Sequence, residues 1–197
     1  GNLLYLTDVL VIDLRERYMT EKELIQGCRE EKQSFQKQLY DRYSSKMYVV
    51  CLRYAKSSSE AQDILQDGFI KVFDKIHQFA FQGSFEGWIR RIMINTALNY
   101  CRKSSFKFEL DGMEALAELQ TASKAISKLS ELEILQMIQC MPDGYRLVFN
   151  LYVIEGYKHS EIAKMLNISK NTSRSQLSKG RKFMQKLFKI NTGDYVG

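Results

Sequence analysis

The sequence EAQDILQDGFIKVFDKIH, residues 60–77, decides how this chain is organised. Its apolar side chains recur at the i, i+3, i+4, i+7 spacing of an amphipathic helix. The apolar face consists of Ala61, Ile64, Leu65, Gly68, Phe69, Val72, Phe73 and Ile76, and the opposite face of Gln62, Asp63, Gln66, Asp67, Lys71 and Asp74. Because the second face is largely acidic, it does not suit nucleic acid and favours a basic protein partner.

An aromatic loop with the sequence FAFQGSF, residues 79–85, follows this helix. It breaks the helical period, and Gly83 gives its backbone conformational freedom. Ser84 is the expected N-cap of the next helix. Because a loop stays at the surface to hydrate its backbone, the three phenylalanine rings are candidate stacking surfaces. The alternative is that they are core side chains.

The helix after the loop is basic, with no acidic residue between Trp88 and Phe108. Its positive side chains are Arg90, Arg91, Arg102 and Lys103. Along one face Arg91, Asn95 and Asn99 recur every fourth residue. A run of arginines is usually a solvated face. Here it coincides with amides and aromatics, a combination that suits phosphates and unstacked bases.

The charge of the whole chain points the same way. There are 29 basic and 23 acidic residues, a net charge of +6 and a pI near 9.0, which favours a polyanionic partner. Residues 156–189 hold nine Lys/Arg against Glu161 alone, whereas residues 109–133 hold six acids against Lys124 and Lys128. This asymmetry predicts two basic modules separated by an acidic spacer.

Composition indicates an all-α protein, because there is a single proline and little strand-like alternation. The four cysteines are scattered without the spacing of a zinc site, so we expect reduced thiols and neither metal nor cofactor. No apolar run approaches the roughly 20 residues of a membrane span. Residues 1–18 lack the pattern of a signal peptide, and the expectation is either that Met19 is the natural start or that these residues are a loose extension ahead of it. We therefore expect a cytoplasmic protein.

Helix boundaries can be placed from local signals. Thr20 and Glu23 form a capping box, and the apolar stripe of the next segment predicts a long helix over Ser34–Tyr54. Weak helical periodicity over Glu114–Met141 ends at Pro142, which marks a boundary. The following short helix has an expected core stripe of Tyr145, Val148, Phe149, Tyr152 and Val153. Gly156 is its expected C-cap.

Residues 160–189 have the pattern of a helix-turn-helix. Ser160 is the expected cap of the first helix, Asn167 takes the left-handed turn position, and Ser169 caps the second helix. The inward stripe of that second helix is Ser173, Leu177, Gly180, Met184 and Leu187. Its outward residues are Lys170, Asn171, Arg174, Ser175, Ser178 and Lys179, which suit bases and phosphates in a major groove. The alternative is a plain three-helix packing unit.

Together these segments resemble the extracytoplasmic-function (ECF) sigma factors of the sigma-70 family, the promoter-specificity subunits of bacterial RNA polymerase. The resemblance covers roughly Phe35 to Lys189. It rests on FxxxLYxxY (35–43), AQDILQDGFIKVF (61–73), FEGWIxRI with NTAxNY (85–100), Met141-Pro142, and EIAxxLxISxxT (161–172) with Ser175. One helix-turn-helix is weak evidence, but the ordered motifs at this separation are specific.

The resemblance implies a role for each segment. The polymerase-binding face would contain Asp63, Gln66 and Asp67. The minus-ten promoter element would be bound by Phe79, Phe81, Gln82, Ser84, Phe85, Arg91, Asn95, Asn99 and Arg102. The minus-thirty-five element would be bound by Lys170, Asn171, Arg174, Ser175, Ser178 and Lys179. The family also implies an anti-sigma factor, often membrane-anchored, as a further partner.

By the same resemblance the chain divides into five parts: an extension (1–18), a region 2 helical domain (19–105), an acidic flexible linker (106–130), a region 4 helix-turn-helix domain (131–191) and a tail (192–197). Ser173 and Gly180 depart from the valine and alanine usual in the family, and both are expected to loosen their helix. The competing hypotheses are a free-standing helix-turn-helix regulator and an enzyme. The second has little support, since His77 and His159 are the only histidines and no catalytic motif accompanies them.

Overall fold

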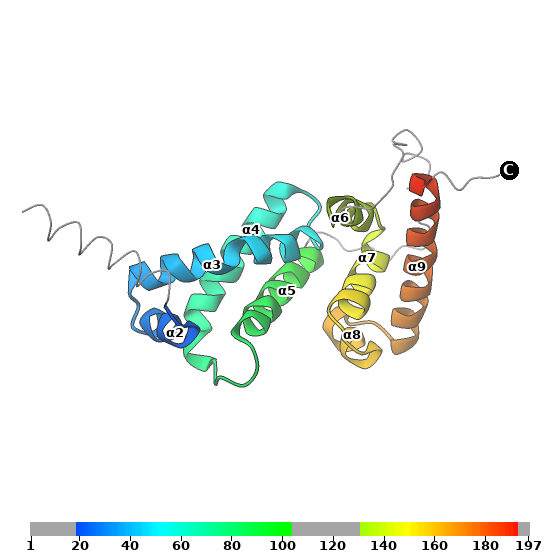
Figure 1. Ribbon diagram of the computed structural model, residues 1–197. Helices are drawn as coiled ribbons and strands as arrows, with labels where there is room; N and C mark the ends of the chain where they lie inside the picture. Colours follow the sequence, from blue (N-terminus) through cyan, green and yellow to red (C-terminus); the bar gives the residue numbers. More distant parts are fainter. Residues whose placement is uncertain (1–18, 104–130, 193–197) are drawn as a thin grey trace, which may run out of the picture.

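The computed structural model describes residues 19–103 and 131–192, and in these two ranges every regular element is a helix (Figure 1). This confirms the all-α prediction and the division into two helical units. The expectations for Gly1–Tyr18, for most of the acidic spacer and for the C-terminal tail lie outside the described residues.

The N-terminal unit is a helical bundle. Its elements are α2 (Glu21–Arg29), α3 (Gln33–Leu52), α4 (Ser58–Lys75), the short 3-10 helix η1 (Ile76–Gln78) and α5 (Phe85–Lys103). Helices α3, α4 and α5 pack against one another and α2 packs on α3 (Figure 1). The predicted capping box of α2 is present: the amide of Thr20 donates to Glu23 at 2.9 Å, and the amide of Glu23 donates to the Thr20 hydroxyl at 3.3 Å.

A glycine permits the close approach of α4 and α5. A Cβ atom added to Gly68 would lie 2.2 Å from the sulfur of Met93, which is fully buried. The apolar face of α4 predicted from the sequence is therefore the face that meets α5. The opposite, acidic face of α4 stays on the outside of the bundle, where it can contact a partner.

The C-terminal unit contains α6 (Glu131–Gln139), α7 (Asp143–Phe149) with the π-helical turn η4 (Asn150–Ile154), α8 (His159–Leu166) and α9 (Lys170–Thr192). Pro142 precedes α7 and Asn167 is left-handed with φ 53°, both as predicted. The predicted C-cap Gly156 lies one residue beyond the actual C-cap, Glu155, and has φ +77°. The predicted cap Ser169 accepts a hydrogen bond from the amide of Thr172 at 2.9 Å.

Two local predictions were wrong. Ser160 is not the cap of α8, because the helix begins at His159, two residues earlier than that cap would place it, and the amide of the N-cap Lys158 donates to Glu161 at 2.7 Å. Val153 is 47% exposed and does not belong to the core stripe. The π turn η4 adds a residue to the helical register, so a 3.6-residue period counted from Tyr145 no longer predicts which side chain faces inward.

The two units are in direct contact. The backbone carbonyls at and just beyond the C-terminal end of α3 accept hydrogen bonds from side chains of the C-terminal unit. Gln139 donates to Leu52 O at 3.0 Å. Asn150 donates to Arg53 O at 2.7 Å, and Arg146 donates to Tyr54 O at 3.3 Å. Glu155, whose side chain is 4% exposed, lies between Arg53 (3.0 Å) and Arg90 (3.3 Å) of the N-terminal unit.

Candidate protein-docking and nucleic-acid interfaces

The acidic face of α4 lies at the surface. Asp63 and Gln66 are exposed, and Ile70 on the same face is 58% exposed. Asp67 is half-buried, because the hydroxyl of Tyr100 on α5 donates to its carboxylate at 2.7 Å. This hydrogen bond, together with burial, raises the pKa of Tyr100 to about 12. An exposed apolar side chain among carboxylate and amide groups is typical of a protein-docking surface.

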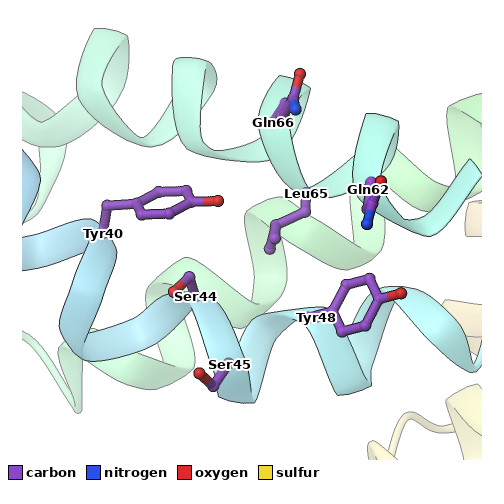
Figure 2. Close-up of a pocket in the computed structure, with 7 residues that line it drawn as sticks. All are labelled: Tyr40, Ser44, Ser45, Tyr48, Gln62, Leu65 and Gln66. Atoms are coloured by element: carbon purple, nitrogen blue, oxygen red, sulfur yellow. The ribbon is translucent and has the colours of Figure 1, made fainter. Parts of the chain in front are cut away.

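A groove of about 460 Å³ adjoins this face, between α3 and α4 (Figure 2). Its lining comes from Tyr40, Ser44, Ser45 and Tyr48 on α3 and from Gln62, Leu65 and Gln66 on α4. Leu65 lies between the two tyrosine rings in Figure 2. The sequence patterns did not indicate the α3 residues as part of a site, although Tyr40, Ser44 and Tyr48 recur every fourth position and therefore share a helix face.

The three loop phenylalanines differ in exposure. Phe79 and Phe85 are 3% and 0% exposed and pack on Trp88 with ring centroids 5.6 Å away in each case. The expectation that their rings are stacking surfaces was therefore wrong. Phe81 is 46% exposed, and its backbone has φ 56°. The loop is thus anchored by two buried rings and presents one ring to solvent.

The basic face of α5 is available for nucleic acid. Arg91, Asn95, Asn99 and Arg102 are exposed, as are Gln82 and Ser84 of the loop. Ser84 also caps α5, because its hydroxyl accepts the amide of Gly87 at 3.1 Å. Arg90 differs from the other arginines of this helix, since it is paired with Glu155 of the C-terminal unit. The structure therefore presents the predicted amides and guanidinium groups on one accessible surface.

The outward residues of α9 are all exposed at its N-terminal half: Lys170, Asn171, Arg174, Ser175, Ser178 and Lys179. Ser173 on the inner side is fully buried, and its hydroxyl lies 2.9 Å from Nδ1 of His159. The His159 ring stacks on Tyr152 at 4.5 Å. Burial, followed by the charges of Arg174, Lys170 and Arg181, lowers the pKa of His159. This arrangement leaves the cations and polar groups of one helix facing outward, where they can enter a groove of nucleic acid.

The cysteines and the possible metal ligands among the described residues bear on metal binding and on nucleophilic chemistry. Over residues 19–103 and 131–192 there is no cluster of three His, Cys, Asp or Glu side chains suited to a metal ion. The four cysteines form no disulfide, and burial raises the pKa of Cys51 to about 12, which disfavours the nucleophilic thiolate. Within the same ranges no helix is long and apolar enough to cross a membrane.

Comparison with known proteins gives two family matches. The family described as Sigma-70 region 2 matches residues 39–106, and the family described as Sigma-70, region 4 matches residues 131–184. The chain is 30% identical over 160 residues to the ECF RNA polymerase sigma factor SigW of Bacillus subtilis strain 168, covering 75% of this chain and 86% of that protein. It is 25% identical over 175 residues to the ECF RNA polymerase sigma-E factor of Escherichia coli K12, covering 83% and 91%.

A solved structure shows the same fold at lower identity. It is the sigma factor RpoE in complex with the anti-sigma factor NepR from Bartonella quintana. The match has a TM-score of 0.50 and 18% sequence identity, and covers 79% of this chain and 97% of the other. The two helical units and their order along the chain are therefore shared with a protein of known structure.

Proposed function

Because this chain belongs to the ECF sigma factors of the sigma-70 family, we propose that its exposed surfaces divide the work of promoter-directed transcription initiation among them. As a sigma factor it binds core RNA polymerase and recognises promoter DNA. The proposal assigns polymerase binding to α4, capture of the minus-ten element to the loop and α5, and the minus-thirty-five element to α9. We further propose that the chain has no catalytic activity and acts in the cytoplasm.

The observation that supports this division most is the charge contrast between adjacent helices of one unit. The acidic face of α4 exposes Asp63, Gln66 and Ile70, and these three side chains cannot neutralise phosphates. On α5 the exposed groups are Arg91, Asn95 and Asn99, which can bind phosphates and bases. A free-standing DNA regulator has no use for the first surface, whereas a subunit that docks on a larger machine needs both.

Polymerase binding by α4 can be tested by placing lysines at two exposed positions of its acidic face. The variant carrying Asp63→Lys and Gln66→Lys should lose binding to core polymerase, because it places positive charge where a basic partner docks. Glu131→Lys, which reverses the charge of an exposed acid on α6, is the control for positive charge added elsewhere on the surface. Asp67 is left intact, since its replacement would also break the Tyr100 contact. Retained polymerase binding by the double variant would contradict the assignment.

Promoter contact by α9 should separate into specific and non-specific parts. Arg174→Ala is expected to cost about 1–3 kcal/mol at one base position and to relax specificity there, as expected for loss of a bidentate contact to a base. Lys179→Ala should weaken binding about equally on all sequences and lower the salt dependence. Binding of duplex promoter DNA by the polymerase holoenzyme, measured at several salt concentrations, distinguishes the two patterns. Identical behaviour of the two variants would contradict the separate roles assigned to Arg174 and Lys179.

The promoter itself can be found by selection from the host genome. Run-off transcription with core polymerase, this chain and fragmented host DNA should give discrete transcripts that need the chain. The free-standing regulator predicts tight duplex binding by the chain alone and no such transcripts. We also propose an anti-sigma factor as a partner, supported by the family and by the likeness of fold to RpoE, which was solved with one. Affinity capture from host cells, with the Asp63→Lys, Gln66→Lys variant for comparison, tests this.

A further inference from the structure

We infer that the outer side of α9, beyond its predicted DNA-contacting residues, is a docking surface for the acidic segment 109–119 of this same chain. The surface, which we call the basic groove, comprises Lys182, Gln185, Lys186, Phe188 and Lys189. The proposed function gives these five residues no task, because the residues of α9 assigned to promoter DNA end at Lys179. The inference therefore goes beyond the division of surfaces proposed above and does not depend on it.

The basic groove combines three cations with an aromatic ring. Its volume is about 500 Å³, and its lysines recur at positions 182, 186 and 189, the spacing of one side of a helix. Phe188 is 46% exposed, whereas its neighbour Leu187 is 4% exposed and belongs to the core of the C-terminal unit. A large exposed aromatic side chain flanked by lysines favours a partner that supplies both negative charge and apolar side chains.

An apolar edge of α6 lies at the same end of the C-terminal unit. Helix α6 packs on α9, and Figure 1 shows α6 at the end of the unit that holds the C-terminal turns of α9. Met137 of α6 belongs to the same buried cluster as Leu187. Ile134, about one helical turn before Met137, is 43% exposed. The core of this unit therefore reaches the surface at the end where the basic groove lies.

Segment 109–119 has the chemistry that fits this surface. Its sequence is ELDGMEALAEL, with four acids, four large apolar residues and no basic residue. Its carboxylates can pair with the lysines of the groove, while its leucines can cover Phe188 and Ile134. Duplex DNA would neutralise the lysines but would leave both apolar side chains in water. The segment therefore fits the whole surface, whereas DNA fits only its charged part.

The segment is also close enough along the chain to reach the basic groove. Leu119, its last residue, precedes Glu131, the first residue of α6, by 12 positions. A stretch of this length spans up to about 40 Å when extended. Such a tether gives an effective concentration on the order of 1 mM, so a contact with a Kd of about 0.1 mM is occupied about ten times as often as it is empty. Docking therefore needs far fewer contacts than an interface between separate proteins.

Zero-length cross-linking of the full chain tests this docking. A carbodiimide joins a carboxylate to a lysine amine only where the two are in contact, and peptide mass spectrometry then identifies the pair. Cross-links should join the acids of segment 109–119 to Lys182 and Lys186. Lys164, an exposed lysine of α8 in the same unit, is the control for random encounter and should give at least fivefold fewer. An equal yield at Lys164 would overturn the inference.

Nearness along the chain by itself favours the groove lysines over Lys164, so a second comparison removes apolar contacts and keeps every charge. Leu116→Ser combined with Leu119→Ser should lower the cross-link yield at the groove lysines about fivefold or more, because two leucines are no longer buried. Phe188→Ser should act in the same way from the other side of the contact. Val153→Ser is the matched control, since Val153 is 47% exposed on η4.

The double leucine variant keeps the test decisive if Phe188→Ser does not fold, because it changes no residue of the described helices. Cross-link yields that this variant leaves unchanged would overturn the inference. A melting temperature equal to that of the unaltered chain shows that a lower yield comes from lost docking rather than from unfolding.

A second copy of the chain and duplex DNA are the competing occupants of the basic groove. In a mixture of isotope-labelled and unlabelled chains, the inference predicts cross-links within one chain, and cross-links that mix the two isotopes would overturn it in favour of a second copy. DNA as the sole occupant predicts cross-link yields at Lys182 and Lys186 no higher than at Lys164. It also predicts weaker binding of random duplex by the Lys182→Ala, Lys186→Ala variant. These two results together would overturn the inference in favour of DNA.

Discussion

Replacement of Glu155 by glutamine should destabilise the N-terminal unit, although Glu155 belongs to the C-terminal unit. Its carboxylate is 4% exposed and lies 3.0 Å from Arg53 and 3.3 Å from Arg90, whose side chains are 13% and 35% exposed. Removing one member of a buried ion pair costs about 3–5 kcal/mol. Because Arg90 keeps partial access to water and glutamine keeps one acceptor oxygen, we expect a loss of about 2–3 kcal/mol in the free energy of unfolding.

The measurement is urea denaturation followed by the fluorescence of Trp88, the only tryptophan, which lies on α5 of the N-terminal unit. Glu86→Gln is the control, because Glu86 pairs with Lys46 at 2.9 Å while both side chains stay 36% or more exposed. Such a surface pair should contribute less than about 1 kcal/mol. A double-mutant cycle of Glu155→Gln with Arg53→Met should give a coupling of at least about 1 kcal/mol. Equal effects of Glu155→Gln and Glu86→Gln would refute the claim that the contact links the stability of the two units.

Three further predictions concern packing, pH and the acidic face. Gly68→Ala should destabilise the chain by about 1–2 kcal/mol, because the new Cβ would lie 2.2 Å from the buried sulfur of Met93. Gly180→Ala should be neutral or stabilising by up to about 1 kcal/mol, because the nearest neighbour of its new Cβ is the movable Met141 methyl at 3.1 Å. Thermal denaturation of the two variants compares these effects. The lowered pKa of His159 means that the unfolded chain binds this proton at higher pH, so stability should fall as pH drops below about 6.5, and His159→Gln should flatten the dependence of the melting temperature on pH. Tyr100→Phe should leave the fold intact and lower the phenolic titration near pH 12 by one group, since Asp67 raises that pKa; an unchanged titration would exclude the contact.

The sequence predicted those features that depend on neighbouring residues. Thr20, Pro142 and Asn167 act within a few positions of themselves, and each prediction is confirmed. The amphipathic period of α4 likewise identified both the face that packs on α5 and the face that stays outside. Such signals do not depend on tertiary contacts, because capping and helical spacing are properties of one segment.

Features set by residues distant in the chain were not predictable in this way. The local sequence predicts that Glu155 is a solvated residue at a helix end. It is buried instead, because Arg53 and Arg90, 102 and 65 positions away in the chain, both pair with its carboxylate. The loop rule that favoured exposed rings failed for Phe79 and Phe85, because Trp88 and the bundle cover them. The hydrogen bonds of Arg29 have no local signal for the same reason, since the carbonyls that accept them, those of Ile76 and Phe79, lie 47 and 50 positions ahead.

The effect of a departure from the family pattern also depends on residues that are distant in the chain. Serine in place of valine at position 173 was expected to loosen the recognition helix. In the structure the buried hydroxyl is satisfied by His159 of the preceding helix at 2.9 Å, so it does not carry the cost of an unpaired polar group. His159 in turn stacks on Tyr152, whose ring also faces the guanidinium of Arg181 at 5.8 Å. Ser173 therefore belongs to a series of polar and aromatic contacts that connects α8 to α9. Ser173→Val alone would remove the hydrogen-bond partner of the half-buried His159 imidazole rather than improve the core.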